Sequence, residues 1–198
     1  MRFHIGPIPN TESSGLPPGQ WTPLRYDCGP GIMQLFAWPI GGIAFVSVGW
    51  LWLHETQAMK HLGNNPTALL VGLIIALLAF IPIHELLHVF THPDFGMSRK
   101  TVVGAWPSRL LFYAHYDGPR SRERLIVCIA APFLMMTVAP LLIALLTGHA
   151  SVIIAFVSTL NALASGADIF AVGTLLWQVP RGTNVFNQGW RTYWAARQ

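Results

Sequence analysis

The chain has 198 residues, of which 53% are hydrophobic and only 10% are charged. Its mean hydropathy is +0.47, whereas soluble domains carry about 25% charged residues. This composition excludes an ordinary soluble domain and a disordered chain, and it indicates an integral membrane protein. We therefore expect a lipid bilayer as a partner. Because the formal net charge is only +4, we expect no nucleic acid as a partner.

Four apolar segments are long enough to cross a bilayer, which takes about 20 helical residues. They cover residues 34–53, 67–90, 125–148 and 150–178. The predicted fold class is therefore an all-α integral membrane protein, with a bundle of about four transmembrane helices. This divides the chain into a polar N-terminal segment (1–33), a transmembrane core (34–180) that contains a loop (91–124), and a C-terminal tail (181–198).

The basic residues are unevenly distributed between these parts. Eleven of the twelve lie in the N-terminal segment, the long loop and the tail, and Lys60 is the exception. Because cytoplasmic loops carry an excess of Lys and Arg, we expect a multi-pass protein of the cytoplasmic (inner) membrane with both termini in the cytoplasm. Trp50 and Trp52 are then expected at the outer interface, and Trp38 and Trp177 near the inner one.

The loop between the second and third spans contains a candidate β-hairpin. Residues 100–105 and 109–116 are typical of short strands, and Trp106-Pro107-Ser108 supplies a turn between them. The sequence therefore predicts a small cytoplasmic hairpin, which could hold an extended substrate segment by strand addition.

The second span carries His84-Glu85-Leu86-Leu87-His88, an HExxH motif. Residues four apart lie on one helix face, about 6 Å apart along the axis, so both imidazoles can bind one metal ion. Glu85 can then reach a water molecule on that metal. The alternative is structural pairing of polar groups, but ionisable residues inside a span are costly and usually mark function. The motif therefore predicts a zinc site.

The fourth span supplies a candidate third ligand. Counted from the outer ends of their spans, His84 and His88 lie 17 and 21 residues in, and Asp168 lies 18 residues in. Parallel neighbouring helices would therefore place Asp168 level with the histidines. Catalytic zinc usually keeps three protein ligands and one position for water, which favours Asp168 as the third ligand.

Two other residues compete with Asp168. Asp94 stands where the motif HExxHxxGxxH places its third ligand, although Thr91 replaces the glycine of that motif. His92 continues the helix face of His88, but a proline follows it and is expected to end the helix. His115, in the loop, is expected at the surface.

Asn161 lies seven residues before Asp168, two helical turns away on the same face. Its amide could donate a hydrogen bond to a substrate carbonyl or oxyanion. Equally, it could hydrogen-bond across helices and hold the bundle together.

Taken together, these residues resemble a family of small prokaryotic membrane proteins of the zincin peptidase type. That family is similar in layout to the site-2 intramembrane metalloproteases. The resemblance covers roughly residues 80–190 and rests on the HExxH motif, Ala131-Pro132, Asn161, Ser165-Gly166-Ala167-Asp168 and Val179-Pro180-Arg181-Gly182. It implies that His84, His88 and Asp168 are zinc ligands and that Glu85 is catalytic. The chain lacks the Asn-Pro-Asp-Gly context in which site-2 proteases place their third ligand.

Three functional hypotheses follow. The first is a membrane-embedded zinc-dependent endopeptidase that hydrolyses peptide bonds of a membrane protein or peptide within or next to the membrane, with the zinc-bound water activated by Glu85. The alternative is a catalytically silent, metal-binding membrane scaffold or adaptor. A metal permease is a third reading, but four spans with one acidic site make a poor pathway.

Overall fold

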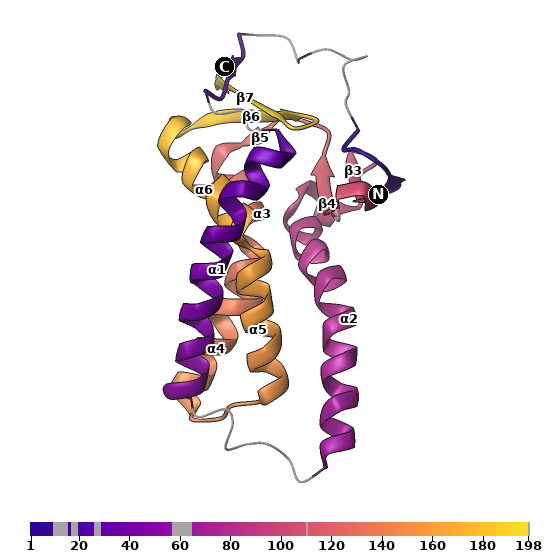
Figure 1. Ribbon diagram of the computed structural model, residues 1–198. Coiled ribbons are helices and arrows are strands. Elements are labelled where there is room, and N and C mark those ends of the chain that lie inside the picture. The colour runs from indigo at the N-terminus through magenta and orange to yellow at the C-terminus, as the bar shows by residue number, and fades with distance from the viewer. Residues whose placement is uncertain (10–15, 17–19, 26–28, 57–64, 110, 198) are drawn as a thin grey trace. The chain divides into compact units, whose positions relative to one another are not determined.

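The computed structural model describes residues 1–9, 16, 20–25, 29–56, 65–109 and 111–197. Lys60, the exception in the charge distribution, lies outside these residues. The described chain is mostly helical, but it also contains two β-sheets (Figure 1). The prediction of a purely all-α fold was therefore wrong, because the N-terminal segment and the C-terminal tail form strands as well as the loop.

The chain divides into two compact units. Unit 1 comprises residues 1–33, 85–130 and 171–198, and unit 2 comprises residues 34–84 and 131–170. Unit 1 contains both sheets and the helical segments that join them, whereas unit 2 is built from apolar helices.

The long helices agree with the predicted spans at three places. The helices are α1 (Pro30–His54), α2 (Pro66–Thr91) and a run of α3 (Arg122–Pro132), η5 (Phe133–Val138) and α4 (Ala139–Thr147). Three helical segments, Gly31–His54, Pro66–Thr91 and Arg122–Thr147, are long and apolar enough to cross a membrane. In this respect the sequence pattern predicted the helical elements and their type.

The fourth predicted span is broken. It consists of α5 (Val152–Ala164) and α6 (Gly166–Gln178), which are bent by 51° at Ser165. Each piece has 13 residues and extends only about 20 Å at 1.5 Å per residue, so neither crosses a bilayer alone. The chain thus has three continuous candidate spans, or four if the bent pair acts as one.

The third span contains a π-helical segment, η5. The backbone N–H of Ala139 bonds to the carbonyl of Leu134, five residues earlier. Such a wider turn is rare and occurs mostly at functional sites. Here it directly follows Pro132, whose carbonyl oxygen accepts a hydrogen bond from a side chain of α5.

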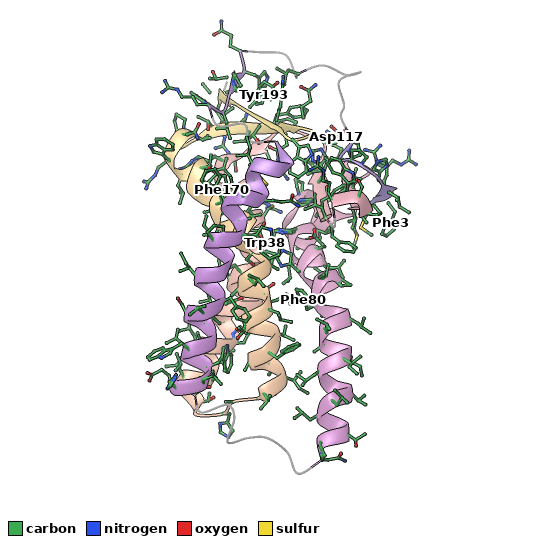
Figure 2. The ribbon with its side chains drawn as sticks, in the orientation of Figure 1. Phe3, Trp38, Phe80, Asp117, Phe170 and Tyr193 are labelled. Carbon is green, nitrogen blue, oxygen red and sulfur yellow. The ribbon has the colours of Figure 1, made fainter. Side chains whose placement is uncertain are left out.

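Unit 2 has an apolar core made by α1, α4 and α5. Its buried residues are Val48, Trp52, Leu141, Ala144 and Ala162. Trp52 is only 2% exposed, and its indole Nε1 donates to Ser158 Oγ at 2.9 Å. The expectation that Trp52 anchors the chain at a membrane interface was therefore wrong, because its polar group is satisfied inside the unit. Trp38 and Trp50 are exposed on α1, and Figure 2 labels Trp38.

The first sheet of unit 1 contains the predicted hairpin. Strands β3 (Thr101–Trp106) and β4 (Leu111–Tyr116) pair antiparallel around the turn η4 (Pro107–Arg109). The N-terminal strand β1 (Arg2–Ile5) adds to β3 in parallel, so the strand order is β1-β3-β4. This pairing connects residues about 100 positions apart, and no local sequence signal predicts it.

The second sheet of unit 1 joins three distant parts of the chain. Its order is β2 (Thr22–Pro23), β7 (Arg191–Ala196), β6 (Thr183–Gln188) and β5 (Arg120–Ser121). All neighbouring strands are antiparallel. One strand precedes α1, one precedes α3 and two follow α6. These strands pack with an apolar cluster that includes Leu24, Leu125, Leu175, Val179 and Val185.

Candidate metal centre

Helix α2 positions both histidines of the motif. It is continuous from Pro66 to Thr91, with Pro82 inside it. His84 is buried, and Glu85 and His88 are partly buried. Because the two histidines are separated by one helical turn, their rings project from the same face of α2, and Glu85 lies about 100° further round from His84.

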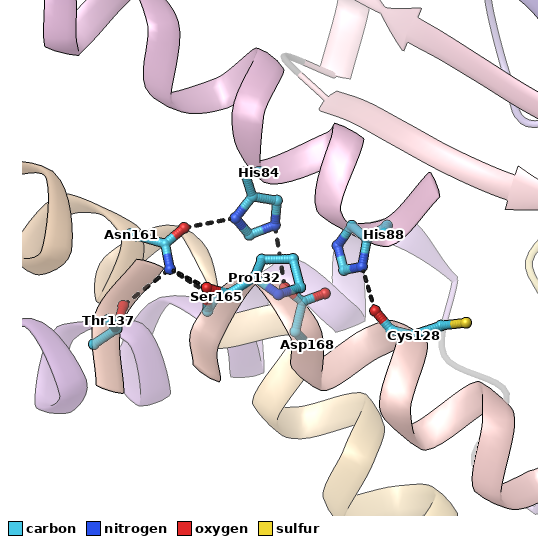
Figure 3. Close-up of polar contacts among 8 residues, drawn as sticks. All are labelled: His84, His88, Cys128, Pro132, Thr137, Asn161, Ser165 and Asp168. Carbon is cyan, nitrogen blue, oxygen red and sulfur yellow. Dashed lines mark hydrogen bonds and ion pairs between the residues drawn. The ribbon is translucent and has the colours of Figure 1, made fainter. Parts of the chain in front are cut away.

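Asp168 reaches His84 because the fourth apolar segment is broken. The bend at Ser165 starts α6 at Gly166, which places Asp168 in the first turn of the helix. Its Oδ2 atom lies 3.2 Å from Nε2 of His84 (Figure 3). The structure thus brings together His84 and Asp168, which the sequence predicts at the same depth in their two spans. The partial positive charge at a helix N-terminus also stabilises a carboxylate in this position.

Close packing of glycines fixes the start of α6. A Cβ atom on Gly166 would clash with the carbonyl oxygen of Ala37 and would lie 2.8 Å from the backbone nitrogen of Gly41. A Cβ atom on Gly41 would in turn clash with the carbonyl of Leu163. Only glycine allows α1 to approach the α5–α6 break this closely, and this approach places Asp168.

Asn161 sets the tautomer of His84. Asn161 Nδ2 lies 3.0 Å from the carbonyl oxygen of Pro132, an atom that can only accept a hydrogen bond. The same nitrogen lies 2.9 Å from Oγ1 of Thr137. The amide nitrogen is therefore the donor on that side, and Oδ1 is the atom 2.8 Å from Nδ1 of His84. Because an amide oxygen only accepts, Nδ1 carries a proton, and in the neutral ring Nε2 is then the nitrogen with the lone pair.

A buried chain of hydrogen bonds supports Asn161. The hydroxyl of Thr137 donates to the carbonyl of Ser158 at 3.1 Å. The hydroxyl of Ser158 donates to the carbonyl of Thr137 at 3.2 Å and accepts from Trp52. Asn161, Ser158 and Thr137 are all fully buried. The network thus extends from Trp52 on α1 to His84 on α2 entirely within unit 2.

His88 is oriented in the same way within unit 1. Its Nδ1 atom lies 2.8 Å from the backbone carbonyl oxygen of Cys128 on α3 (Figure 3). A carbonyl only accepts, so Nδ1 of His88 carries a proton. In both histidines of the motif Nδ1 thus donates to a backbone or amide oxygen, which leaves Nε2 as the nitrogen that can bind a metal when the ring is neutral.

The contact between His84 and Asp168 fits a bound cation. If His84 is neutral, its Nε2 lone pair and the Asp168 carboxylate are two electron-pair donors that face each other at 3.2 Å, an arrangement that a cation between them would stabilise. Zinc bonds of about 2.0–2.2 Å in tetrahedral geometry place two ligand atoms about 3.4 Å apart. The donor chemistry and this separation both match a zinc site, whereas without a metal the pair requires a protonated imidazole.

The two competing ligands lie elsewhere in unit 1. α2 ends at Thr91, and His92 is buried beyond it with its ring 5.6 Å from that of Tyr116. Asp94 is exposed in η3 (Pro93–Gly96), where its φ is 55°. Neither residue belongs to the group of His84, His88 and Asp168, which could hold a metal ion among the described residues.

The loop histidines are neutral. Burial, with a smaller contribution from the nearby Arg120, lowers the pKa of His92 to about 3. The same two causes lower the pKa of His115 to about 4. His115 is only 4% exposed, so its expected place at the surface was wrong. Arg120 lies over the ring of Tyr116, with Cζ 5.6 Å from the ring centre.

Sequence reasoning did not single out Thr137 or Ser158, and it placed Trp52 at a membrane interface instead of in this network. A usable signal was nevertheless present, because hydroxyl groups inside apolar spans need partners and an indole N–H is usually satisfied when buried. Which partners they take depends on the helix packing and on the π-helical turn after Pro132, and neither has a periodic sequence pattern.

The helix with two Nε2-presenting histidines and the carboxylate opposite the first one define a candidate zinc-binding site of the HExxH type. Residues 77–183, more than half of the chain, match the family described as "Putative zincin peptidase". The chain belongs to this family, whose description denotes a metallopeptidase. The comparison with curated proteins gave no significant match, and neither did the comparison with solved structures.

Proposed function

We propose that this protein is a membrane-embedded, zinc-dependent endopeptidase that hydrolyses peptide bonds within or next to the membrane. The observation that carries the proposal is the 3.2 Å contact between Nε2 of His84 and Oδ2 of Asp168, with Nδ1 of His84 already committed to Asn161. Membership of the zincin peptidase family supports it.

In this proposal His84, His88 and Asp168 hold the zinc ion, through two imidazole nitrogens and one carboxylate oxygen. Two neutral histidines and one carboxylate are a common ligand set for catalytic zinc. When bound, zinc supplies Lewis-acid chemistry: it acidifies water and polarises a carbonyl oxygen. Asn161 and the Cys128 carbonyl keep the two imidazoles oriented, because each accepts the Nδ1 proton of one ring.

Glu85 is the proposed general base. It lies next to His84 on α2 and carries the only carboxylate of that helix. Its carboxylate takes a proton from the water that attacks the scissile carbonyl, and it returns that proton to the leaving amine nitrogen. The new C–O bond forms first, and the peptide C–N bond breaks once its nitrogen has received the proton, so the water is divided between the two products.

The proposal places α2 across the bilayer with the motif near its cytoplasmic end. α2 has 26 residues, about 39 Å at 1.5 Å per residue, which exceeds the hydrocarbon thickness of about 30 Å. His84 lies seven residues before the end of α2 at Thr91, about 10 Å along the axis. Substrate bonds near the cytoplasmic interface would therefore be the ones within reach.

The second sheet of unit 1 supports a four-span topology. Strand β2 precedes α1, β5 follows α2, and β6 and β7 follow α6, yet all four share one sheet. Strands of one sheet must lie on the same side of a membrane, so an even number of crossings separates them. α1 and α2 supply two crossings, and the α3–α4 run supplies a third, so the bent α5–α6 pair must supply a fourth. The excess of Lys and Arg assigns this side to the cytoplasm.

The proposal is tested with purified, zinc-loaded full-length protein in liposomes and a library of peptides that contain membrane segments. We expect cleavage by the wild type and none by Glu85→Gln with its zinc still bound. If neither protein cleaves any peptide and Glu85→Gln has no cellular phenotype, the peptidase proposal fails. If Asp168→Asn also disrupts a membrane assembly that Glu85→Gln leaves intact, the scaffold alternative is favoured.

A further inference from the structure

One face of the first sheet is apolar and exposed. Two rows of residues cross β1, β3 and β4 in register: Phe3, Val103 and Ala114 form one row, and Ile5, Ala105 and Phe112 form the other. We call these six residues the apolar sheet face. Phe3 is 79% exposed, Ile5 82% and Phe112 51%.

The opposite face of this sheet is packed within unit 1, as is the Thr101–Tyr116 row at one end of the face that carries Phe3 and Ile5. Val102, Tyr113 and His115 alternate with the apolar sheet face along β3 and β4, and all three are buried. The hydroxyl of Tyr113 also donates to the carbonyls of Gly6 and Pro7. An antiparallel hairpin in water normally turns polar residues outward, but the outward rows here contain no polar side chain.

A second exposed apolar segment adjoins this face. Phe95 and Met97 follow the end of α2 and are 71% and 80% exposed. The backbone of Phe95 has a φ of 51°, a conformation rare for bulky residues that persists only when the surroundings impose it. The N-terminal amine of Met1 donates to the carbonyl of Met97 at 3.3 Å, which joins this segment to the strand that carries Phe3 (Figure 2).

We infer that the apolar sheet face, with Phe95 and Met97, lies in the headgroup region of the cytoplasmic leaflet of the membrane that α2 spans. This inference rests on the membrane embedding proposed above, but not on zinc binding or peptidase activity. It identifies a lipid surface as the partner of this part of unit 1, in addition to the spanning helices.

The position of Phe95 and Met97 directly after α2 favours lipid as the partner of this surface. Phe95 comes four residues after the end of the helix at Thr91, and Phe90, Leu86 and Ile83 on its last turns are themselves exposed. A helix longer than the hydrocarbon core ends at the interface, so the residues directly after it emerge among the lipid headgroups.

The charges around the face complement anionic lipid. Arg99 and Lys100 lie exposed between Met97 and β3, and Arg109 lies exposed in the turn between β3 and β4. Basic residues beside exposed Phe, Ile and Met side chains are the composition of surfaces that lie in a membrane interface. A second copy of this chain would bring the same basic residues together, which disfavours dimerisation through this face.

The test uses an environment-sensitive fluorophore on single cysteines of the full-length protein in nanodiscs that contain anionic lipid. Cys28→Ser and Cys128→Ser remove the native thiols. Ile5→Cys reports on the apolar sheet face, and His4→Cys is the matched control. His4 is the adjacent residue of β1 and is also exposed, and it alternates with Ile5 to the opposite face of the strand. Leu78→Cys, 72% exposed on α2, reports on the span itself.

We expect nitroxide groups attached to lipid near the headgroup to quench the Ile5 probe at least about threefold more strongly than the His4 probe. Aqueous iodide should show the reverse order. The Leu78 probe should be quenched by nitroxides deep in the acyl chains. If the basic residues hold the sheet face against anionic lipid, the headgroup nitroxide should quench the Ile5 probe less in nanodiscs of neutral lipid than in anionic ones.

Other outcomes overturn the inference in distinguishable ways. If the Leu78 probe is quenched by lipid but the Ile5 probe is quenched only by iodide, the sheet face lies in water while the membrane proposal stands. If the Leu78 probe is also quenched only by iodide, the embedding itself is wrong. Protection of the Ile5 probe from both quenchers, in nanodiscs with two copies or only after a peptide substrate is added, would identify a protein as the occupant.

Discussion

His84 and Asn161 are joined by a buried hydrogen bond of 2.8 Å between Nδ1 and Oδ1. Both polar atoms of the Asn161 side chain are thereby used inside unit 2, since its amide nitrogen donates to Pro132 and Thr137. We therefore assign Asn161 a positioning role toward His84, the proposed zinc ligand. A direct contact with substrate, the other role expected for it from sequence, has no observation in its favour.

Replacing Asn161 should weaken metal binding without touching a ligand. In Asn161→Leu the His84 ring loses the acceptor that fixes its tautomer, and loss of such a partner typically lowers metal affinity about 10–100-fold. Zinc affinity is measured by competition with a chelating dye. Asn161→Asp keeps an acceptor oxygen and should recover part of the affinity.

Ser158→Ala is the matched control for this prediction. It removes a buried hydroxyl from the same network, between Trp52 and Thr137, but does not contact His84. We expect lower stability, by about 1–3 kcal/mol for the unsatisfied partners, with zinc affinity unchanged. Equal zinc affinity in folded Asn161→Leu and wild type would contradict the positioning role.

Asp168 and Glu85 should separate metal binding from turnover. Asp168→Asn keeps the size of the side chain but removes the charge that balances zinc, so we expect a loss of zinc larger than the 10–100-fold effects typical of partners behind the ligands. Glu85→Gln should keep zinc and lose turnover. Metal content measured by mass spectrometry on both purified proteins distinguishes the two roles. Full zinc occupancy in Asp168→Asn, with loss in Asp94→Asn, would show that Asp94 is the third ligand.

Gly166→Ala should displace Asp168 without changing any polar group. The added Cβ would meet the Ala37 carbonyl and the Gly41 nitrogen, both rigid backbone atoms, and such overpacking costs about 1–3 kcal/mol. Gly173→Ala, in the same helix, is the control, because a Cβ there meets nothing within 4 Å. Thermal unfolding in detergent and zinc affinity should both fall in the first variant and not in the second. Equal effects of the two substitutions would argue against close packing as the cause.

Stability should fall as the pH decreases below about 6.5, because His92 and His115 are buried in neutral form. Their folded pKa values of about 3 and about 4 lie below the ordinary value of 6.5, so in this window the unfolded chain binds more protons. Each histidine contributes a slope of up to about 1.4 kcal/mol per pH unit, which ends as the pH reaches the folded pKa.

The double variant His92→Gln/His115→Gln should flatten this pH dependence. Denaturant unfolding of the wild type and the variant at several pH values measures the two slopes. The exposed His149, replaced by Gln, serves as the control and should leave the slope unchanged. A double variant with the wild-type slope would show that these two histidines do not account for the acid sensitivity.

The sequence predicted the elements whose signals are local and periodic. Apolar length identified α1, α2 and the α3–α4 run, and the turn at Pro107 identified the β3–β4 hairpin. His84 and His88 follow directly from helical spacing, since one continuous helix fixes both. Asp168 was predictable because few other carboxylates occur in the apolar segments, so composition reduced the choice.

What the sequence did not predict depends on tertiary contacts. The break at Ser165 lies in a segment that, despite Asn161 and Asp168, is apolar enough overall for hydropathy to indicate one long span. The orientation of Asn161 depends on a hydrogen bond to the carbonyl of Pro132. A π-helical segment begins directly after this proline, and its position has no periodic sequence pattern. The β6–β7 hairpin did have a local signal, because Gly189 lies between two short segments rich in β-branched and aromatic residues, but this region had been assigned to a polar tail.

The four-stranded sheet of unit 1 also determines the order in which parts of the chain can fold during synthesis. β2 is synthesised before the first apolar helix, whereas its neighbour β7 is the last element of the described chain. Every candidate span is therefore synthesised before β2 finds its partner, and until the C-terminal strands are made β2 and β5 lack their neighbours in the sheet. The sheet is thus completed last, so that a chain arrested before residue 183 would hold its helices but leave unit 1 unfinished.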